Sequence, residues 1–191
     1  MLKDLLYQSR SYRSFDESVK IPYEALVEFI DCARLTPSSM NLQVLKFRPV
    51  TDSAECDRIL SCTGWAASLK DVKLPPQGHT PTAYIVICAD KQLRENAESF
   101  QRDLGICAQT IMLAATEAGF GGCMIGSFSP EKVSAALTLP SHILPLLVLA
   151  LGKPDEKVSL TEPKENGSVT YYRENGIHFV PKRKLKDLIL K

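Results

Sequence analysis

The stretch DLGICAQTIMLAATEAGFGGCMIGSF, residues 103–128, decides the fold. Together with the residues just before it, its first half predicts a helix, because apolar side chains recur at every third or fourth position. The main apolar stripe consists of Phe100, Leu104, Cys107, Ile111, Ala114 and Ala118. A second row, formed by Ala108, Met112 and Ala115, extends this stripe. A helix that is apolar over most of its circumference belongs in the core or in a subunit interface. Gly119 and the Gly121-Gly122 pair are expected to end this helix, and residues 123–128 to form a short strand.

The segments on either side of this block show helical and strand-like patterns in turn. Helical spacing predicts helices over residues 1–9, 20–37, 53–62 and 129–140. Apolar runs predict strands over residues 46–52, 83–90 and 144–154. The proline within the first of these runs is typical of an edge strand. Residues 153–176 are polar and are expected to be mostly loop, followed by a strand or extended segment and then a short helix in residues 177–191.

These elements follow one another without a regular strand–helix–strand order. No Gly-x-Gly-x-x-Gly pattern follows a strand, so the glycine signature of a dinucleotide-binding fold is missing. This order favours an α+β fold over a doubly wound parallel sheet. A chain of 191 residues is long enough for one substantial core, and we expect a single domain over residues 1–191.

The composition and net charge indicate which classes of binding partner to expect. With 45% hydrophobic and 24% charged residues the chain has the profile of a soluble globular protein. Its formal net charge of +1 provides no overall field to attract nucleic acid or an anionic membrane, and we expect neither as a partner. Basic residues gather only locally, near both ends of the chain, and such clusters suit a small anionic ligand.

The six cysteines predict neither a metal site nor a thiol redox motif. No two of them form a C-x-x-C pair, and their spacing matches no zinc or iron–sulfur pattern. We therefore expect no metal and reduced thiols, and, with no secretory signal evident, a cytoplasmic protein. The most apolar run, residues 143–151, is too short to span a bilayer and is expected to be a buried strand.

Two basic stretches could bind an anion. In RSYRSF, residues 10–15, Arg10 and Arg13 flank the Ser11 hydroxyl. Two permanently charged guanidinium groups beside hydroxyl donors suit a phosphate, whereas a solvated helix end is the alternative. In HFVPKRKLK, residues 178–186, three consecutive basic residues could complete such a site or form a solvated tail.

Two further stretches could contact a flat polar ligand. TPSSMNLQVLKF, residues 36–47, offers hydroxyl and amide groups without charge, although a capped helix end explains the same residues. In GGCMIGSF, residues 121–128, Gly126 follows an expected strand and would let a ligand approach the backbone closely. A tight strand end is the alternative there.

The order and spacing of these pieces resemble the FMN-dependent nitroreductase family over nearly the whole chain. The matching segments are SRSYRSF, ARLTPSSMNLQ, the block DLGICAQTIMLAATEAGFGGCMIGSF, LPLLVLALGKPDE and HFVPKRKL. The resemblance implies a central mixed or antiparallel sheet flanked by helices. It also implies an intertwined homodimer, with an FMN in each of two clefts at the interface.

The resemblance also implies which residues bind the cofactor. Arg10, Ser11 and Arg13 would lie at the FMN phosphate and ribityl chain, and Lys182 with Arg183 or Lys184 would close on the phosphate. Ile125 and Gly126 would present backbone groups to the polar edge of the ring. From the partner subunit, the flavin would be reached by Pro37, Ser38, Ser39 and Asn41, with Gln43 near the ribityl chain or ring.

In such proteins NADH or NADPH reduces the flavin, and the reduced flavin then passes electrons to a small acceptor in a ping-pong cycle. The expected activity is reduction of nitroaromatic, quinone or similar electron-poor acceptors. The alternatives are a specialised flavin reaction such as reductive dehalogenation, or flavin binding without turnover. No catalytic side chain is expected, and His79, His142 and His178 are interpreted as structural. Val44-Leu45 replaces a common Pro-Trp pair, and residues 61–82, with Trp65, are a candidate lid or an ordered surface loop.

Overall fold

A five-stranded antiparallel sheet forms the centre of the main body in this computed structural model, which describes residues 1–66, 69 and 72–190. The strand order is β1-β5-β3-β2, and β4 pairs with β5 beside β1. The strands are β1 (Phe15–Asp16), β2 (Leu45–Val50), β3 (Ala83–Asp90), β4 (Gly121–Ile125) and β5 (Ile143–Pro154). As the proline in its sequence predicts, β2 is an edge strand.

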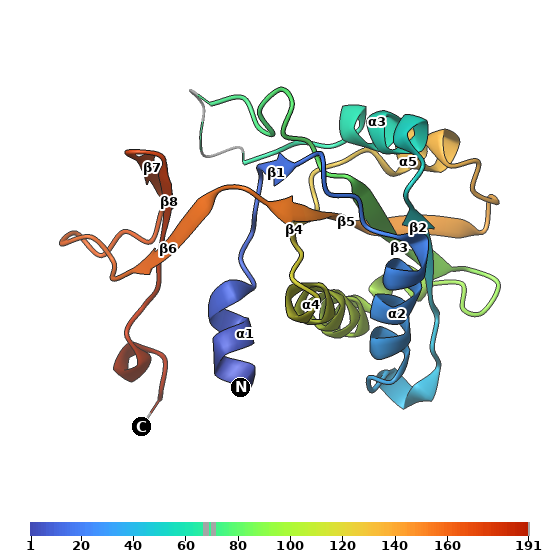
Figure 1. Ribbon diagram of the computed structural model, residues 1–191. Helices are drawn as coiled ribbons and strands as arrows, with labels where there is room; N and C mark the ends of the chain where they lie inside the picture. The colour runs from blue at the N-terminus through green and yellow to red at the C-terminus, as the bar shows by residue number, and fades with distance from the viewer. Residues whose placement is uncertain (67–68, 70–71, 191) are drawn as a thin grey trace.

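Helices cover both faces of this sheet (Figure 1). On one face lie α2 (Tyr23–Arg34) and α4 (Gln101–Glu117), and on the other α3 (Ser53–Ser61) and α5 (Pro130–Ala136). Because neighbouring side chains on a strand point to opposite faces, Ile85 and Ile87 pack against α2 and α4. Tyr84 and Val86 pack in the cluster that includes α3 and α5. Helices plus an antiparallel sheet confirm the α+β class.

The block that decides the fold forms α4, a tight turn and β4. The helix begins at Gln101, after a short 3-10 turn at Ala97–Ser99, and Gly119 ends it with a φ of +81°. The expectation that Gly121 and Gly122 also end the helix is wrong, because both residues pair with β5. At Gly122 a Cβ would lie 2.1 Å from the carbonyl oxygen of Ala150, so this glycine is required for strand packing.

Three helices begin within one residue of their predicted N-terminus, and α2 begins three residues later than predicted. Asp52 caps α3 by accepting a hydrogen bond of 2.9 Å from the Glu55 backbone N–H, and Ser129 caps α5 just before a proline. Pro22 stands at the N-cap of α2, one position before the first helical residue. A 3-10 turn, η1 (Ser39–Asn41), follows α2 and contains residues with positive φ.

The C-terminal region departs most from the sequence expectation. Most of residues 153–176 lie outside strands, as expected, but β5 runs to Pro154 and two further strands that the sequence analysis did not predict lie within this segment. The strands β6 (Lys157–Thr161), β8 (Ile177–Pro181) and β7 (Tyr172–Glu174) form a small second sheet. β8 pairs in parallel with β6 and antiparallel with β7. The predicted short helix follows as the 3-10 turn η3 (Leu185–Asp187).

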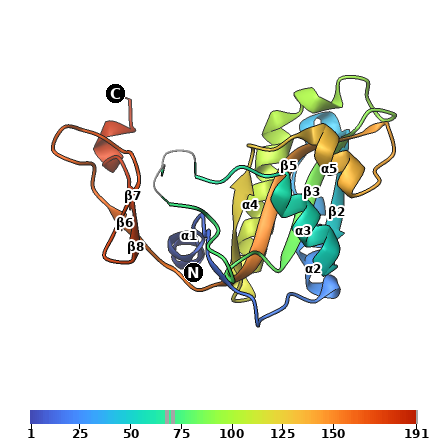
Figure 2. The ribbon, with the colours of Figure 1, turned by 90° about the horizontal axis from the view of Figure 1, so that it is seen from above.

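This small sheet stands beside the main body, and α1 (Leu2–Gln8) lies between the two (Figure 2). The N-terminal segment that follows α1 therefore runs between both sheets. No helix in the described part of the chain is long and apolar enough to cross a membrane. All six cysteines are free thiols.

Candidate functional site

A cavity of about 340 Å³ lies where the N-terminal segment, α4, β4 and the small sheet meet. It brings together residues from both ends of the chain that sequence analysis had proposed for one anion site. Its lining consists of Ser9, Arg10, Ser11, Arg13, Gln109, Met112, Gly122, Met124, Tyr171, His178, Val180 and Lys182. The lining therefore contains three basic side chains, Arg10, Arg13 and Lys182, and no carboxylate.

The segment carrying Arg10 and Ser11 is held at the edge of β4. Ser11 forms a bridge with Gly122, whose carbonyl oxygen accepts a hydrogen bond of 2.9 Å from the Tyr12 backbone N–H. The Arg10 guanidinium donates to the Leu6 carbonyl oxygen at the end of α1, while its Nε is buried and has no partner. A buried donor without a partner is costly unless a ligand supplies an acceptor.

Arg13 connects this segment to the small sheet. Its backbone N–H donates to Glu156, which also accepts from Arg173 on β7. Its guanidinium Nη1 lies 3.3 Å from His178 Nε2 and donates a 3.2 Å hydrogen bond to the Ser11 carbonyl oxygen. The guanidinium carbon also lies 5.2 Å from the centre of the Tyr171 ring. Arg13 is thus anchored through both its backbone and its side chain.

β8 presents alternate residues to the cavity. His178, Val180 and Lys182 follow one another at every second position, so they share one side of the extended chain. The His178 side chain is buried, and its Nδ1 has no hydrogen-bond partner. Burial, with Arg13 and Arg173 nearby, lowers the pKa of His178 to about 4, so its ring is neutral at pH 7.

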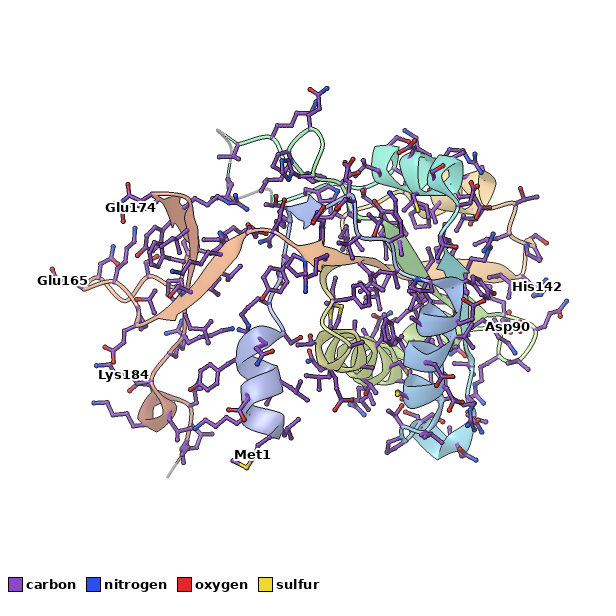
Figure 3. All side chains as sticks on the ribbon, viewed as in Figure 1. Met1, Asp90, His142, Glu165, Glu174 and Lys184 are labelled. Carbon is purple, nitrogen blue, oxygen red and sulfur yellow. The ribbon has the colours of Figure 1, made fainter. Side chains whose placement is uncertain are left out.

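Arg183 and Lys184, the other basic residues proposed for the phosphate, line neither this cavity nor its neighbour. The Lys184 ammonium lies 3.0 Å from the Glu162 carboxylate, and Figure 3 shows Lys184 on the outer side of the small sheet. Among the three basic residues after β8, Lys182 therefore has the placement that a ligand in the cavity requires.

A second cavity of about 330 Å³ adjoins the first and shares Arg13, Met124 and Tyr171 with it. Ile125 and Gly126 line it, together with Trp65. A Cβ built at Gly126 would meet no atom within 4 Å. The chain itself therefore leaves open space above this backbone, as a flat ligand edge would need.

The polar loop after α2 lies elsewhere. Of its proposed flavin contacts, Ser38 and Gln43 line a third cavity of about 210 Å³, and none lines the first two. The described chain thus does not bring Pro37, Ser38, Ser39, Asn41 and Gln43 to the basic cavity. This separation is what a site completed by a second copy would require.

The loop is held by a residue that the sequence analysis did not single out. Asp103, 3% exposed in the first turn of α4, accepts hydrogen bonds of 2.9 Å from the Ser39 backbone N–H and 2.8 Å from its hydroxyl. The Ser39 hydroxyl is therefore engaged in a hydrogen bond within the same chain. Further along the loop, Asn41 and Gln43 have positive φ, and the Gln43 amide donates to Asn41. The available signal for Asp103 was a carboxylate one turn before Cys107, on the apolar face of the helix.

Sequence analysis also missed the groups that surround Arg13. Tyr171, Arg173 and Glu156 belong to a segment expected to be loop, and His178 was interpreted as structural.

In the described residues, no group of three or more His, Cys, Asp or Glu side chains is placed to hold a metal ion.

The donor set of the first cavity fits the phosphate of FMN. Arg10, Arg13 and Lys182 supply positive charge, and the unpartnered Arg10 Nε and His178 Nδ1 supply buried polar atoms. Phosphate oxygens accept several charge-assisted hydrogen bonds, and arginine offers a planar pair of donors for them. The adjoining cavity at Gly126 offers backbone and apolar walls to a ring.

Comparison with known proteins agrees with this geometry. Residues 6–153 match the nitroreductase family. The oxygen-insensitive NADPH nitroreductase of Salmonella typhimurium is 32% identical over 82% of this chain and 67% of its own length. The FMN reductase (NADPH) of Bacillus subtilis is 27% identical over 79% of this chain and 65% of its own length.

Solved structures show the same fold. An FMN-dependent nitroreductase from Clostridium difficile superposes with a TM-score of 0.64 at 26% identity, over 80% of this chain and 87% of that one. A nitroreductase family protein from Clostridium novyi has a TM-score of 0.67 at 24% identity, over 81% and 86% of the two chains. With sequence match, fold and a phosphate-compatible cavity in agreement, this chain belongs to the nitroreductase family.

Proposed function

We propose that the protein is an NAD(P)H-dependent FMN oxidoreductase that reduces nitroaromatic, quinone or similar electron-poor acceptors. The observation that carries this proposal is the basic cavity, in which Arg10, Arg13 and Lys182 face the same space without a carboxylate among the lining residues. Relatives described as NADPH nitroreductase and FMN reductase support the reaction class.

The residues of the chain have distinct roles in this proposal. Arg10, Ser11, Arg13 and Lys182 would hold the phosphate and the adjacent ribityl chain, and the backbone of Ile125 and Gly126 would face the ring. Bound FMN would supply reversible two-electron transfer between the nicotinamide donor and the acceptor. N–H groups and positive charge near the ring would favour the reduced, anionic flavin.

No side chain of the basic cavity needs to transfer a proton. The pKa of His178 is lowered to about 4, mainly by burial, so its ring is uncharged at neutral pH. Burial likewise raises the pKa of the Cys123 thiol, which lines the second cavity, so the thiolate is disfavoured. Trp65 and Met124 instead give the second cavity apolar walls, against which donor and acceptor would bind in turn.

The same proposal includes a homodimer. The polar loop after α2 lies away from the basic cavity, so we infer that Ser38, Asn41 and Gln43 reach the flavin bound by a second copy. Large apolar side chains are exposed near this loop, on α4 and at the C-terminus: Leu35, Met40, Ile106, Leu185 and Leu188. Exposed apolar surface of this kind is typical of subunit interfaces. Free thiols at all six cysteines agree with a cytoplasmic location.

Anaerobic titration of the flavin-loaded protein with NADH and with NADPH tests the proposal. We expect the flavin absorbance to bleach with at least one donor and to return when a nitroaromatic or quinone is added. Bound FMN without any bleaching would make the protein a flavin-binding protein without turnover. A protein that stays colourless when FMN is added would contradict the proposal altogether.

A further inference from the structure

We propose that His178 is a positioning residue for the cofactor phosphate, because its neutral ring accepts a hydrogen bond from Arg13 and fixes the guanidinium at the basic cavity. This inference rests on the proposed FMN function and extends it to a residue outside the expected ligand set. It also gives the small sheet a role, since that sheet carries His178.

The contact between the two side chains determines the protonation of the ring. His178 Nε2 lies 3.3 Å from Arg13 Nη1, and a guanidinium can only donate. Nε2 must therefore be unprotonated, and the ring proton resides on Nδ1. Since His178 is only 2% exposed, water does not compete for this contact.

Two further contacts restrict the guanidinium. Nη1 of Arg13 also donates to the Ser11 carbonyl oxygen at 3.2 Å, and the Tyr171 ring lies under the guanidinium carbon at 5.2 Å. Tyr171 packs edge-on against His178, with ring centres 5.3 Å apart. Both hydrogen bonds use Nη1, so the described contacts leave Nη2 and Nε of Arg13 available for a ligand.

Burial and the positive charges around His178 keep its ring neutral. Arg13 faces it from the N-terminal segment, Arg173 lies directly opposite on β7, and Lys182 follows on the same side of β8. The carboxylate of this cluster, Glu156, accepts from Arg173 and from the Arg13 backbone. Burial and the two arginines lower the pKa of His178 to about 4, so the acceptor form persists at neutral pH.

Three substitutions separate the two ring nitrogens. His178→Gln places an amide oxygen near the position of Nε2 and can still accept from Arg13. His178→Asn retains a polar group near Nδ1 but cannot reach Arg13, and His178→Leu removes both groups. His142→Asn is the matched control, because Figure 3 shows His142 at the opposite end of the molecule from the small sheet.

The test is equilibrium binding of FMN and of riboflavin to the apoprotein, measured by quenching of flavin fluorescence. Riboflavin has the same ring and ribityl chain without the phosphate. We expect His178→Asn and His178→Leu to weaken FMN binding ~10-fold and to change riboflavin binding little, as for loss of a hydrogen bond to a charged group. His178→Gln and His142→Asn should bind both flavins like the wild type.

A double-substitution cycle with Arg13→Ala tests whether the effect passes through Arg13. If it does, His178→Asn weakens FMN binding in the wild type but adds no further loss in Arg13→Ala. Equal losses for FMN and riboflavin, equal effects of Gln and Asn, or full additivity with Arg13→Ala would overturn the inference. Failure of the wild-type protein to bind FMN would instead overturn the proposed function. Far-UV circular dichroism identifies variants that do not fold. If His178→Asn and His178→Leu do not fold, the inference still requires that His178→Gln binds FMN like the wild type.

Discussion

At the scale of single residues, the sequence indicated which groups carry charge but not what each group touches. Arg10, Arg13 and Lys182 were proposed for one anion site, and the structure brings all three to one cavity. Ser39 was proposed as a flavin contact, yet its hydroxyl donates to Asp103. Residue type sets which hydrogen bonds are possible, whereas the partner depends on a contact 64 residues away, which spacing along the chain cannot reveal.

We predict that Ser39→Ala lowers the free energy of unfolding by ~1–3 kcal/mol, because it removes a hydrogen bond from the buried Asp103 carboxylate. The neighbouring Ser38→Ala is the control. The Ser38 hydroxyl oxygen only accepts a long 3.3 Å bond from the Gln43 backbone, so its loss should cost less. Urea denaturation of both variants measures the difference. Equal losses for the two would show that the Asp103 contact contributes nothing.

The depressed pKa of His178 predicts a pH dependence of stability. Folding lowers this pKa from 6.5 to about 4, through burial first and then through Arg13 and Arg173. Between these values the unfolded chain binds a proton that the folded chain does not, so the free energy of unfolding falls as the pH falls through this window. The loss from this group is on the order of 3 kcal/mol.

Urea denaturation at pH 7.5 and pH 5 measures this loss, with His178→Gln as the comparison, because glutamine does not titrate. The wild type should lose more stability than His178→Gln between the two pH values. Parallel losses in the two proteins would mean that His178 titrates normally in the folded state.

At the scale of elements, strong patterns were predictive and short polar strands were not. The 17 residues of α4 and the fully buried β3 follow from apolar spacing alone. β6 and β7 were missed, although Asn175-Gly176 between β7 and the expected strand at β8 is a typical two-residue hairpin turn, and both residues have positive φ. β7 has only three residues, too few to show a hydrophobic alternation, and in β6 the alternation rests on Val158 and Leu160 alone.

Two glycines of the β4 region should respond to alanine in opposite ways. In Gly122→Ala the new methyl group would lie 2.1 Å from the Ala150 carbonyl oxygen, so we expect a loss of stability of ~2 kcal/mol or more. In Gly126→Ala the methyl group meets no atom within 4 Å, so stability should be kept while flavin affinity falls. Thermal unfolding of the apoproteins and flavin titration measure the two effects. Normal flavin binding by Gly126→Ala would place the ring elsewhere.

At the scale of the whole molecule, the two groups of proposed cofactor contacts lie on different parts of one chain. The basic cavity lies between the two sheets, whereas the polar loop after α2 borders a separate cavity of its own. The resemblance noted in the sequence implies that the two groups meet across a dimer. Periodicity and composition could not predict this arrangement, because they describe one chain and a second copy adds contacts between surfaces.

The most direct test of this central claim is flavin binding by mixed dimers. Arg13→Ala impairs the basic cavity, and Asn41→Gly removes a loop amide while tolerating the φ of +56° at that position. Each variant alone should bind little FMN. The two chains, carrying different tags, are refolded together in equal amounts, and the bound flavin is counted per chain.

If each site uses the basic cavity of one copy and the loop of the other, every mixed dimer contains one intact site and one doubly impaired site. Random pairing should then restore flavin to about one quarter of the wild-type amount. No recovery in mixed dimers, or a wild-type monomer that binds FMN fully, would contradict the account.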